Sequence, residues 1–360
     1  MTRSFISPSK FVQGEGELKK LGEYVAGFGK KAILVAHPDD FARVQDILDE
    51  SLSDTDYVHA AFSGESCDAE IGRVVELVRR EDADVVIGLG GGKALDTAKA
   101  TSTLTKKPVI IVPTIASTDA PTSALAIIYT QNGEFERYMH LPKNPDLVLV
   151  DSGIVAKAPT RFLISGMGDA LATVFEARAC IKANKPNMSG GFSTIAAAAI
   201  AETCYATLLE DGHKAKAACD ANVVTKALEN IIETNILLSG LGFESSGLAA
   251  AHAVHDGLTV LEETHHYFHG EKVAFGTLVQ LVLENTDEET LIEVLDFCRS
   301  LSLPVCLADL GVEELDDERL MKVATHACSD LETMDNMPFE VTPKDVAAAI
   351  RTADIIGRTW

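Results

Sequence analysis

The chain has 360 residues, of which 46% are hydrophobic and 24% are charged, and its formal net charge is −23. This length and composition predict a soluble globular protein with two domains, each with its own core. Because no basic face is available to neutralise phosphates, the charge excludes nucleic acid as a partner and disfavours an anionic membrane surface.

The N-terminal residues and the cysteines indicate the compartment. Residues 1–10 contain no apolar segment of signal-peptide length, and no apolar run approaches the roughly 20 residues of a membrane span. The seven cysteines are scattered and form no C-x-x-C pair. We therefore expect a cytoplasmic protein with reduced thiols.

The first half of the chain alternates short apolar runs with helical patterns, which is typical of a parallel sheet with crossover helices. The expected strands and helices are listed here in chain order: strand 31–36, helix 41–52, helix 70–80, strand 83–88, strand 109–112 and strand 146–150.

After Pro159 the sequence becomes rich in alanine, and Gly and Pro separate successive helical patterns. The expected helices are 169–183, 192–210, 214–238, 246–260, 271–285, 288–301, 316–332 and 343–357. The predicted architecture is an α/β domain with a parallel sheet over residues 1–158, followed by an all-helical domain over residues 159–360. A ligand site is expected where the two domains meet.

A glycine-rich turn follows the expected strand 83–88. Gly90, Gly91 and Gly92 precede Lys93 and the first turns of a helix, so backbone N–H groups there can approach a pyrophosphate. Neither the dinucleotide fingerprint nor the P-loop pattern is matched. A tight turn that binds nothing is the alternative. Asp96 is either within reach of a ribose or nicotinamide group, or an acidic residue near a helix N-terminus.

A polar segment, Pro113 to Pro121, follows the next expected strand. In open α/β sheets, ligands bind at the carboxyl ends of the strands. Hydroxyl groups in this segment can bind phosphate and ribose, and Asp119 offers a carboxylate. The alternative is that Asp119 only caps the turn that follows it.

Half of the ten histidines lie between His252 and His269. His252 and His255 are three residues apart and share one face of a helix. Together with Asp169, which we expect to open a helix after Gly168, imidazoles from this cluster suit Zn²⁺ or Fe²⁺. Such an ion acidifies an alcohol, so the predicted reaction is hydride transfer from a metal-bound alkoxide.

These motifs together resemble the glycerol dehydrogenases of the iron-activated (group III) alcohol dehydrogenase superfamily, over nearly the whole length. The matching segments are Ser7-Pro8, Gln13-Gly14, 90–99, 113–121, 168–173, 242–245 and 269–276. The resemblance implies a dehydroquinate synthase-like fold, an NAD-binding α/β domain and a helical metal-binding domain.

The resemblance also implies site residues. Asp169, His252 and His269 would be the zinc ligands, His255 would lie beside them or face the substrate, and Asp119 would contact the hydroxyls of a small polyol. The residues implied to line the NAD site are Gly91, Gly92, Lys93, Asp96, Thr114, Thr118, Ser123, Leu125 and Tyr129. Proteins of this kind are usually homo-oligomers, often octamers.

One position departs from the family pattern. Where an aspartate for the adenosine ribose is expected, this chain has His37, followed by Asp39 and Asp40. Either His37 contacts the ribose or one of these acidic residues replaces the aspartate. The two carboxylates favour NAD over NADP, because they would repel a 2′-phosphate.

The predicted function is zinc-dependent, NAD-linked oxidation of glycerol, or of a related vicinal diol, to dihydroxyacetone or the corresponding hydroxyketone. Glycerol-1-phosphate dehydrogenase, another polyol dehydrogenase and a dehydroquinate synthase-like lyase are alternatives within the same fold. The phosphate and carboxylate substrates need more cationic residues than Arg161 and Lys272 supply near the metal motifs. A nucleotide-binding scaffold without catalysis would be expected to lack the three metal-ligand candidates.

Overall fold

The computed structural model describes residues 2–360, and its internal contacts divide the chain into two compact units. The first, here called the α/β unit, comprises residues 6–158 and 218–237. The second, the helical unit, comprises the residues up to Phe5, 159–217 and 238–360. Segment 218–237 thus packs with the α/β unit, although residues 159–217, which precede it in sequence, belong to the helical unit. The expected division into domains 1–158 and 159–360 stays a prediction.

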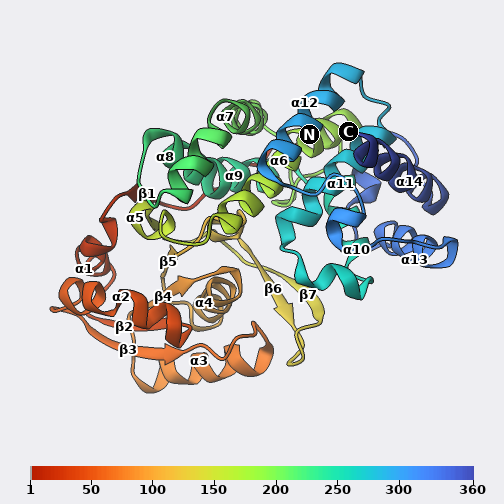
Figure 1. Cartoon of the computed structure of the whole chain (residues 1–360). Helices are drawn as coiled ribbons and strands as arrows, with labels where there is room; N and C mark the ends of the chain where they lie inside the picture. Colours follow the sequence, from red (N-terminus) through yellow and green to blue (C-terminus); the bar gives the residue numbers. More distant parts are fainter. Residues whose placement is uncertain (1) are drawn as a thin grey trace. The chain divides into compact units, whose positions relative to one another are not determined.

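A six-stranded, all-parallel sheet forms the centre of the α/β unit (Figure 1). Its strand order is β1-β8-β5-β4-β2-β3. Its strands are β1 (Phe11–Gly14), β2 (Lys31–Ala36), β3 (Asp56–Ala61), β4 (Val85–Gly90), β5 (Val109–Pro113) and β8 (Leu147–Asp151). The parallel sheet expected from the sequence is confirmed. The edge strands β1 and β3 were not predicted, because their half-exposed residues do not form the continuous apolar runs of the inner strands.

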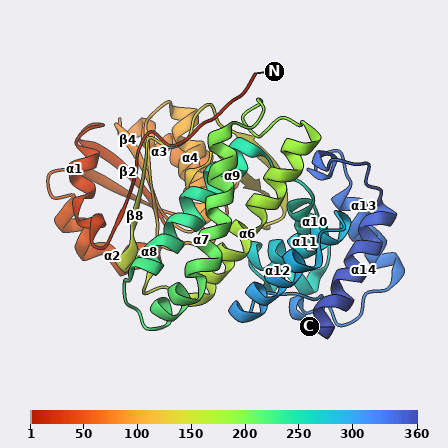
Figure 2. The same ribbon diagram turned by 90° about the horizontal axis from the view of Figure 1, so that it is seen from above.

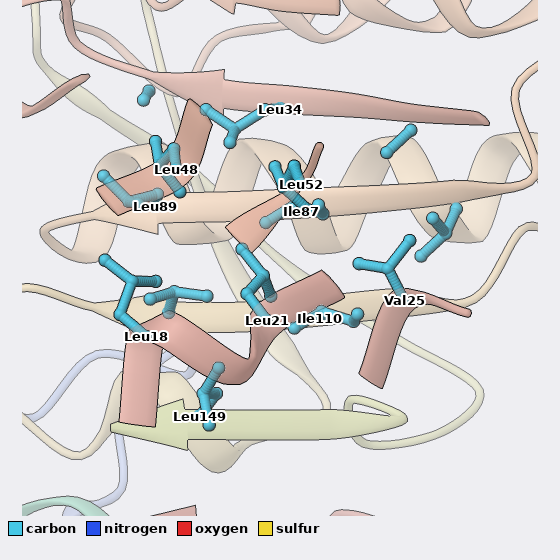
Figure 3. Close-up of a cluster of buried hydrophobic side chains, with 14 of the residues drawn as sticks. Leu18, Leu21, Val25, Leu34, Leu48, Leu52, Ile87, Leu89, Ile110 and Leu149 are labelled. Atoms are coloured by element: carbon cyan, nitrogen blue, oxygen red, sulfur yellow. The ribbon is translucent and has the colours of Figure 1, made fainter. Parts of the chain in front are cut away.

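Helices pack on this sheet and bury its apolar side chains. They are α1 (Leu21–Val25), α2 (Pro38–Ser51), α3 (Asp68–Arg80), α4 (Gly92–Thr105), α5 (Ser152–Val155) and α8 (Lys226–Glu233), with the short helices η1 (Glu17–Lys20), η2 (Ala120–Thr122) and η3 (Thr234–Leu238). Figure 3 shows one core cluster. In it, Leu21 of α1 and Leu48 of α2 pack with Leu34, Ile87 and Ile110 of the strands β2, β4 and β5. All five are fully buried.

An antiparallel hairpin of β6 (Leu125–Tyr129) and β7 (Phe135–His140) follows the polar segment after β5. This hairpin was not predicted from the sequence. The two strands are short and half-exposed, and β7 carries charged residues.

The helical unit has no strand longer than an isolated bridge between Arg3 and Phe192 in the part of the chain that the structure describes. Its helices are α6 (Thr160–Ala183), α7 (Ile195–Asp220), α9 (Ser239–Ser246), α10 (Ala250–Leu258), α11 (His269–Leu283), α12 (Glu288–Leu301), α13 (Asp317–Ala327) and α14 (Pro343–Thr359), with η4 (Glu262–His266), η5 (Ala308–Leu310) and η6 (Met334–Asn336). Helix α11 contacts α6, α10 and α14 (Figure 2). Among residues 2–360, no helix has both the length and the apolar content needed to cross a bilayer.

Several helix predictions were wrong in their boundaries, and one of them, helix 192–210, is part of α7, which continues to Asp220. Asp169 does not open a helix, because α6 begins at Thr160 and continues through the glycines that suggested a start. The expected helix 214–238 is divided, since α7 ends at Asp220 and α8 begins after its capping residue Thr225. The expected helix 246–260 is interrupted by Gly247, whose φ of 107° ends α9.

Candidate active site

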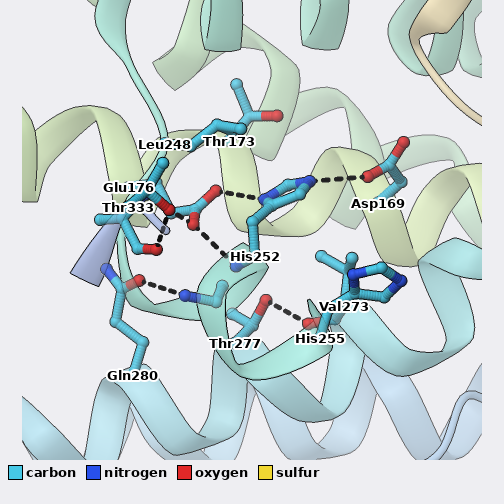
Figure 4. Close-up of polar contacts among 12 residues, drawn as sticks. Asp169, Thr173, Glu176, Leu248, His252, His255, Val273, Thr277, Gln280 and Thr333 are labelled. Carbon is cyan, nitrogen blue, oxygen red and sulfur yellow. Dashed lines mark hydrogen bonds and ion pairs between the residues drawn. The ribbon is translucent and has the colours of Figure 1, made fainter. Parts of the chain in front are cut away.

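Three helices of the helical unit bring Asp169, His252 and His269 together. Asp169 lies in α6, His252 in α10, and His269 is the first residue of α11. One ligand atom from each residue lies within 4.8 Å of the others. Asp169 Oδ1 is 3.4 Å from His252 Nε2 and 3.2 Å from His269 Nε2. Figure 4 shows the carboxylate of Asp169 facing the His252 ring.

The close contact of α6 with α11 depends on Gly270. A Cβ on this residue would come 1.8 Å from the carbonyl oxygen of Ser165, so only glycine permits the approach. Because His269 is its neighbour in the chain, this contact holds the His269 ring beside Asp169. The glycines near Asp169 therefore serve helix packing rather than helix initiation.

The electrostatic setting suits a cation. Burial alone would raise the pKa of Asp169, but the nearby imidazoles of His269 and His252 outweigh burial and hold this pKa well below its usual range. Burial alone would lower the pKa of His252, but the carboxylates of Glu176 and Asp169 raise it well above its usual value. One buried carboxylate and two imidazole nitrogens form a donor set that fits Zn²⁺ or Fe²⁺.

His255 is buried beside this cluster. Its Nε2 lies 3.0 Å from Nδ1 of His269, and its Nδ1 lies 2.9 Å from Oδ1 of Asp256. Burial and the neighbouring His269 lower the pKa of His255 to about 4. A neutral His255 can therefore accept a hydrogen bond from His269. These contacts indicate that it orients His269, and its expected catalytic role stays a prediction.

His265 lies outside the cluster. Its side chain is exposed, and its Nε2 is 2.9 Å from the carbonyl oxygen of Thr259 in the neighbouring turn. This arrangement gives the ring no role in holding a metal.

In the α/β unit, the glycine run lies between β4 and α4. Gly90 has a φ of 135°, and Gly91 is the N-cap of α4, with no side chain capping the helix. No heavy atom lies within 4 Å of where a Cβ of Gly92 would be. The first turn of α4 therefore presents backbone N–H groups where a phosphate can approach.

Two expected cofactor residues have partners within the α/β unit. The Lys93 ammonium contacts both carboxylate oxygens of Glu65 at 2.7 Å and lies 4.8 Å from the ring centre of Tyr129. Asp96 is buried, pairs with Lys99 at 2.9 Å and accepts a 3.0 Å hydrogen bond from the N–H of Ile127. These contacts support the β6–β7 hairpin.

Lys99 also joins α4 to the segment before β6. Its buried ammonium donates to the carbonyl oxygens of Ala120, Ser123 and Leu125. The cofactor roles expected for Ser123, Leu125, Tyr129, Lys93 and Asp96 stay predictions.

The polar segment 113–121 lies at the carboxyl end of β5, as expected from the sequence. Thr114 and Asp119 are nearly buried, whereas Thr118 is half-exposed. The Asp119 carboxylate makes no capping hydrogen bond to η2, which follows it. The substrate contact expected for Asp119 and the alternative in which it only caps this turn both stay predictions.

The residues after β2 are helical rather than a loop. His37 is the N-cap of α2, and its Nδ1 accepts a 3.3 Å hydrogen bond from the N–H of Asp39. The carboxylate of Asp40 lies against the glycine run, 3.1 Å from where a Cβ of Gly90 would be. Asp40 therefore places a carboxylate, which also pairs with Arg43, beside the expected pyrophosphate turn.

Comparisons with known proteins agree with these features. A family model described as iron-containing alcohol dehydrogenase matches residues 8–152. A glycerol dehydrogenase of Citrobacter freundii is 50% identical over 100% of this chain and 99% of its own length. A glycolaldehyde reductase of Halobacterium salinarum is 46% identical over 99% of both. The crystal structure of a probable glycerol dehydrogenase from Sinorhizobium meliloti 1021 has a TM-score of 0.94 and 46% identity, covering 100% of both chains.

The chain belongs to the iron-containing alcohol dehydrogenase family. This assignment confirms the resemblance and the fold class drawn from the sequence motifs. The iron-containing alcohol dehydrogenase model stops at residue 152, before the cluster of Asp169, His252 and His269. The full-length relatives extend over that cluster.

Two carboxylates beside the cluster were missed by the sequence analysis, Glu176 and Asp256. Glu176 lies seven residues after Asp169, which puts both on one face of α6, and this spacing was a usable signal. Asp256 follows His255 directly and had no periodic pattern to single it out.

Proposed function

We propose that this protein is a zinc-dependent, NAD-linked dehydrogenase that oxidises glycerol, or a closely related vicinal diol, to the hydroxyketone. The observation that carries this proposal is the cluster of Asp169, His252 and His269, whose ligand atoms lie within 4.8 Å of one another. The names of the full-length relatives support the substrate class.

Asp169, His252 and His269 would hold the cation. When bound, a divalent metal ion lowers the pKa of a coordinated alcohol and thereby favours the loss of hydride from carbon. Three protein ligands leave room for substrate oxygens, as in other catalytic zinc sites. The buried carboxylate of Asp169 balances part of the charge of the cation.

The cofactor would bind at the start of α4. Backbone N–H groups at Gly91, Gly92 and Lys93 would face the pyrophosphate, and the hydroxyls of Thr114 and Thr118 would donate to phosphate or ribose. The carboxylate of Asp40 against Gly90 favours NAD, because it would repel the 2′-phosphate of NADP. A ribose contact of His37 would have to leave its Nδ1 free to cap α2, because that atom accepts a hydrogen bond from the N–H of Asp39.

Asp119 would accept hydrogen bonds from the substrate hydroxyls, because it follows the carboxyl end of β5, where ligands bind in open α/β sheets. A phosphorylated or carboxylated substrate is less favoured. Arg161, the cation expected to serve such a substrate, is held by both carboxylate oxygens of Glu271 at 2.6 and 2.8 Å.

The expected homo-oligomer, possibly an octamer, and the cytoplasmic location stay predictions.

A second candidate is the reduction of glycolaldehyde, the activity named for the Halobacterium salinarum relative at 46% identity. Glycolaldehyde carries two adjacent oxygens, as a vicinal diol does, so the same groups would serve the reverse hydride transfer.

The deciding experiment compares the two activities in the zinc-loaded protein. NADH formation with glycerol and NADH consumption with glycolaldehyde are measured by absorbance at a common pH. A higher kcat/KM for glycerol supports the first proposal, and a higher value for glycolaldehyde supports the second. Turnover of neither substrate would contradict both.

A further inference from the structure

Glu176 contacts the metal-ligand candidate His252 from a buried position on α6. Its side chain is 0% exposed. Oε2 lies 2.7 Å from Nδ1 of His252, and Oε1 accepts hydrogen bonds of 2.8 and 3.0 Å from the backbone N–H groups of Ala249 and His252 (Figure 4). One carboxylate thus holds both the backbone and the ring of His252.

Glu176 replaces a capping side chain that α10 lacks. The N-cap of α10 is Ala249, whose methyl group cannot accept a hydrogen bond. Glu176 accepts from Ala249 and His252, and Gln280 of α11 accepts from Ala251 at 3.0 Å. The N–H donors and the positive end of the helix dipole compensate the negative charge of the buried carboxylate.

The ring contact decides which nitrogen of His252 carries the proton. A carboxylate at 2.7 Å from Nδ1 can only accept, so Nδ1 must donate its hydrogen to Glu176. In the neutral ring the lone pair then resides on Nε2, the nitrogen that faces Asp169. A metal ligand needs its lone pair at that position.

We propose that Glu176 is a positioning residue that presents the Nε2 lone pair of His252 to the cation. This role rests on the metal site of the proposed function. In this proposal α6 contributes two residues to the site. Asp169 is a metal ligand, and Glu176, two turns later, orients the ligand His252 of α10.

Glu176→Gln tests this role with little change in shape. If the amide oxygen keeps the two backbone hydrogen bonds, the amide nitrogen faces Nδ1, which must then accept. The proton of a neutral His252 moves to Nε2 and blocks the metal position. Loss of such an orienting contact is expected to weaken zinc binding about 10- to 100-fold.

Gln280→Ala is the matched control. It removes a hydrogen bond from the same end of α10, to the N–H of Ala251, without touching the His252 ring. Zinc affinity is measured on metal-stripped proteins by competition with a chromogenic chelator, and the unfolding temperature of each metal-free protein is recorded alongside.

The proposal expects Glu176→Gln to lose zinc affinity and Gln280→Ala to keep an affinity near that of the unmodified protein. Equal affinity in Glu176→Gln, or an equal loss in both variants, would overturn it and leave Glu176 as a helix cap only. If Glu176→Gln does not fold, Glu176→Asp carries the same test, because the shorter side chain withdraws the carboxylate from Nδ1. Failure of the unmodified protein to bind zinc would instead contradict the metal site itself.

Discussion

The α-carbon of Gly168 lies against the carbonyl oxygen of Gly270, so that a Cβ on Gly168 would come within 2.4 Å of that oxygen. Asp169 follows the first glycine and His269 precedes the second. The contact between the two backbones therefore holds two of the three metal-ligand candidates next to each other. Helix packing and the metal site depend on the same pair of residues.

Replacing Gly168 by alanine is expected to lower both stability and zinc binding, because α6 and α11 must separate to admit the methyl group. Overpacking of this kind costs about 1–3 kcal/mol. Chemical denaturation and zinc stoichiometry measure the two effects. The control is Gly72→Ala in α3, where no atom lies within 4 Å of the new Cβ. This change is expected to stabilise the protein by about 0.5–1 kcal/mol. A Gly168→Ala protein as stable as the Gly72→Ala protein would contradict the packing argument.

Removing the metal is expected to abolish activity, and added Zn²⁺ is expected to restore it. His252→Ala should lose bound zinc, since its Nε2 belongs to the cluster. His265→Ala should retain it, because the exposed ring of His265 lies outside the cluster, with its Nε2 2.9 Å from the carbonyl oxygen of Thr259. Metal content by elemental analysis and turnover before and after chelation check both statements. Full turnover in metal-stripped protein would rule out the metal mechanism.

NAD is expected to be preferred over NADP, with kcat/KM at least about tenfold higher, which corresponds to roughly 1.4 kcal/mol of repulsion. Asp40→Ser should narrow this preference, because it removes the carboxylate next to Gly90. Asp46→Ser, at another acidic position of α2, serves as the control. Comparable kcat/KM values for both coenzymes in the unmodified protein would show that Asp40 does not set the selectivity.

Asp119→Asn is expected to lower kcat/KM for glycerol while leaving zinc content and unfolding temperature unchanged. A hydrogen bond to a charged carboxylate is worth roughly 1.5–3 kcal/mol, so the loss should be about 10- to 150-fold. Simple monohydric alcohols, which offer fewer hydroxyls, should lose less. Unchanged glycerol kinetics would mean that the substrate is recognised by other residues.

Glu70 is expected to make stability depend on pH. Its carboxylate accepts from the guanidinium of Arg73 and from the N–H of Ser63 at 3.1 Å. Burial raises the pKa of Glu70, but these donors outweigh burial and lower the pKa below its ordinary value. The stabilisation is therefore fully present above the unfolded-state pKa of about 4.3 and is lost as the pH falls through the lower folded-state pKa.

Glu70→Gln should consequently destabilise the metal-free protein by about 1–2 kcal/mol at pH 7, through the loss of a charged hydrogen bond. The difference from the unmodified protein should shrink at acidic pH, where Glu70 itself becomes protonated. Urea denaturation of both proteins, at pH 7 and at acidic pH, measures this difference in the free energy of unfolding. A difference that is independent of pH would show that the charge of Glu70 does not contribute.

Much of the architecture followed from local patterns in the sequence. The inner strands β2, β4, β5 and β8 are continuous apolar runs, because parallel strands covered on both faces bury nearly every side chain. The metal-ligand candidates were recognisable because five histidines occur within a short stretch of an alanine-rich sequence. The glycine run was recognisable because it follows an apolar strand.

Tertiary structure alone decided how the cluster is held. The boundary of α6 was misjudged because a glycine that permits close helix packing looks, in sequence, like a glycine that starts a helix. Glu176 and Gln280 accept hydrogen bonds from the N-terminal N–H groups of α10, although both lie in other helices. No local sequence pattern predicts which distant side-chain oxygen will accept from a given N–H group. The packing of α6, α10 and α11 determines these hydrogen-bond partners, and this packing depends on the whole helical unit. Sequence periodicity shows which face of each helix is buried, but the identity of the neighbour on that face depends on contacts between residues far apart in the chain.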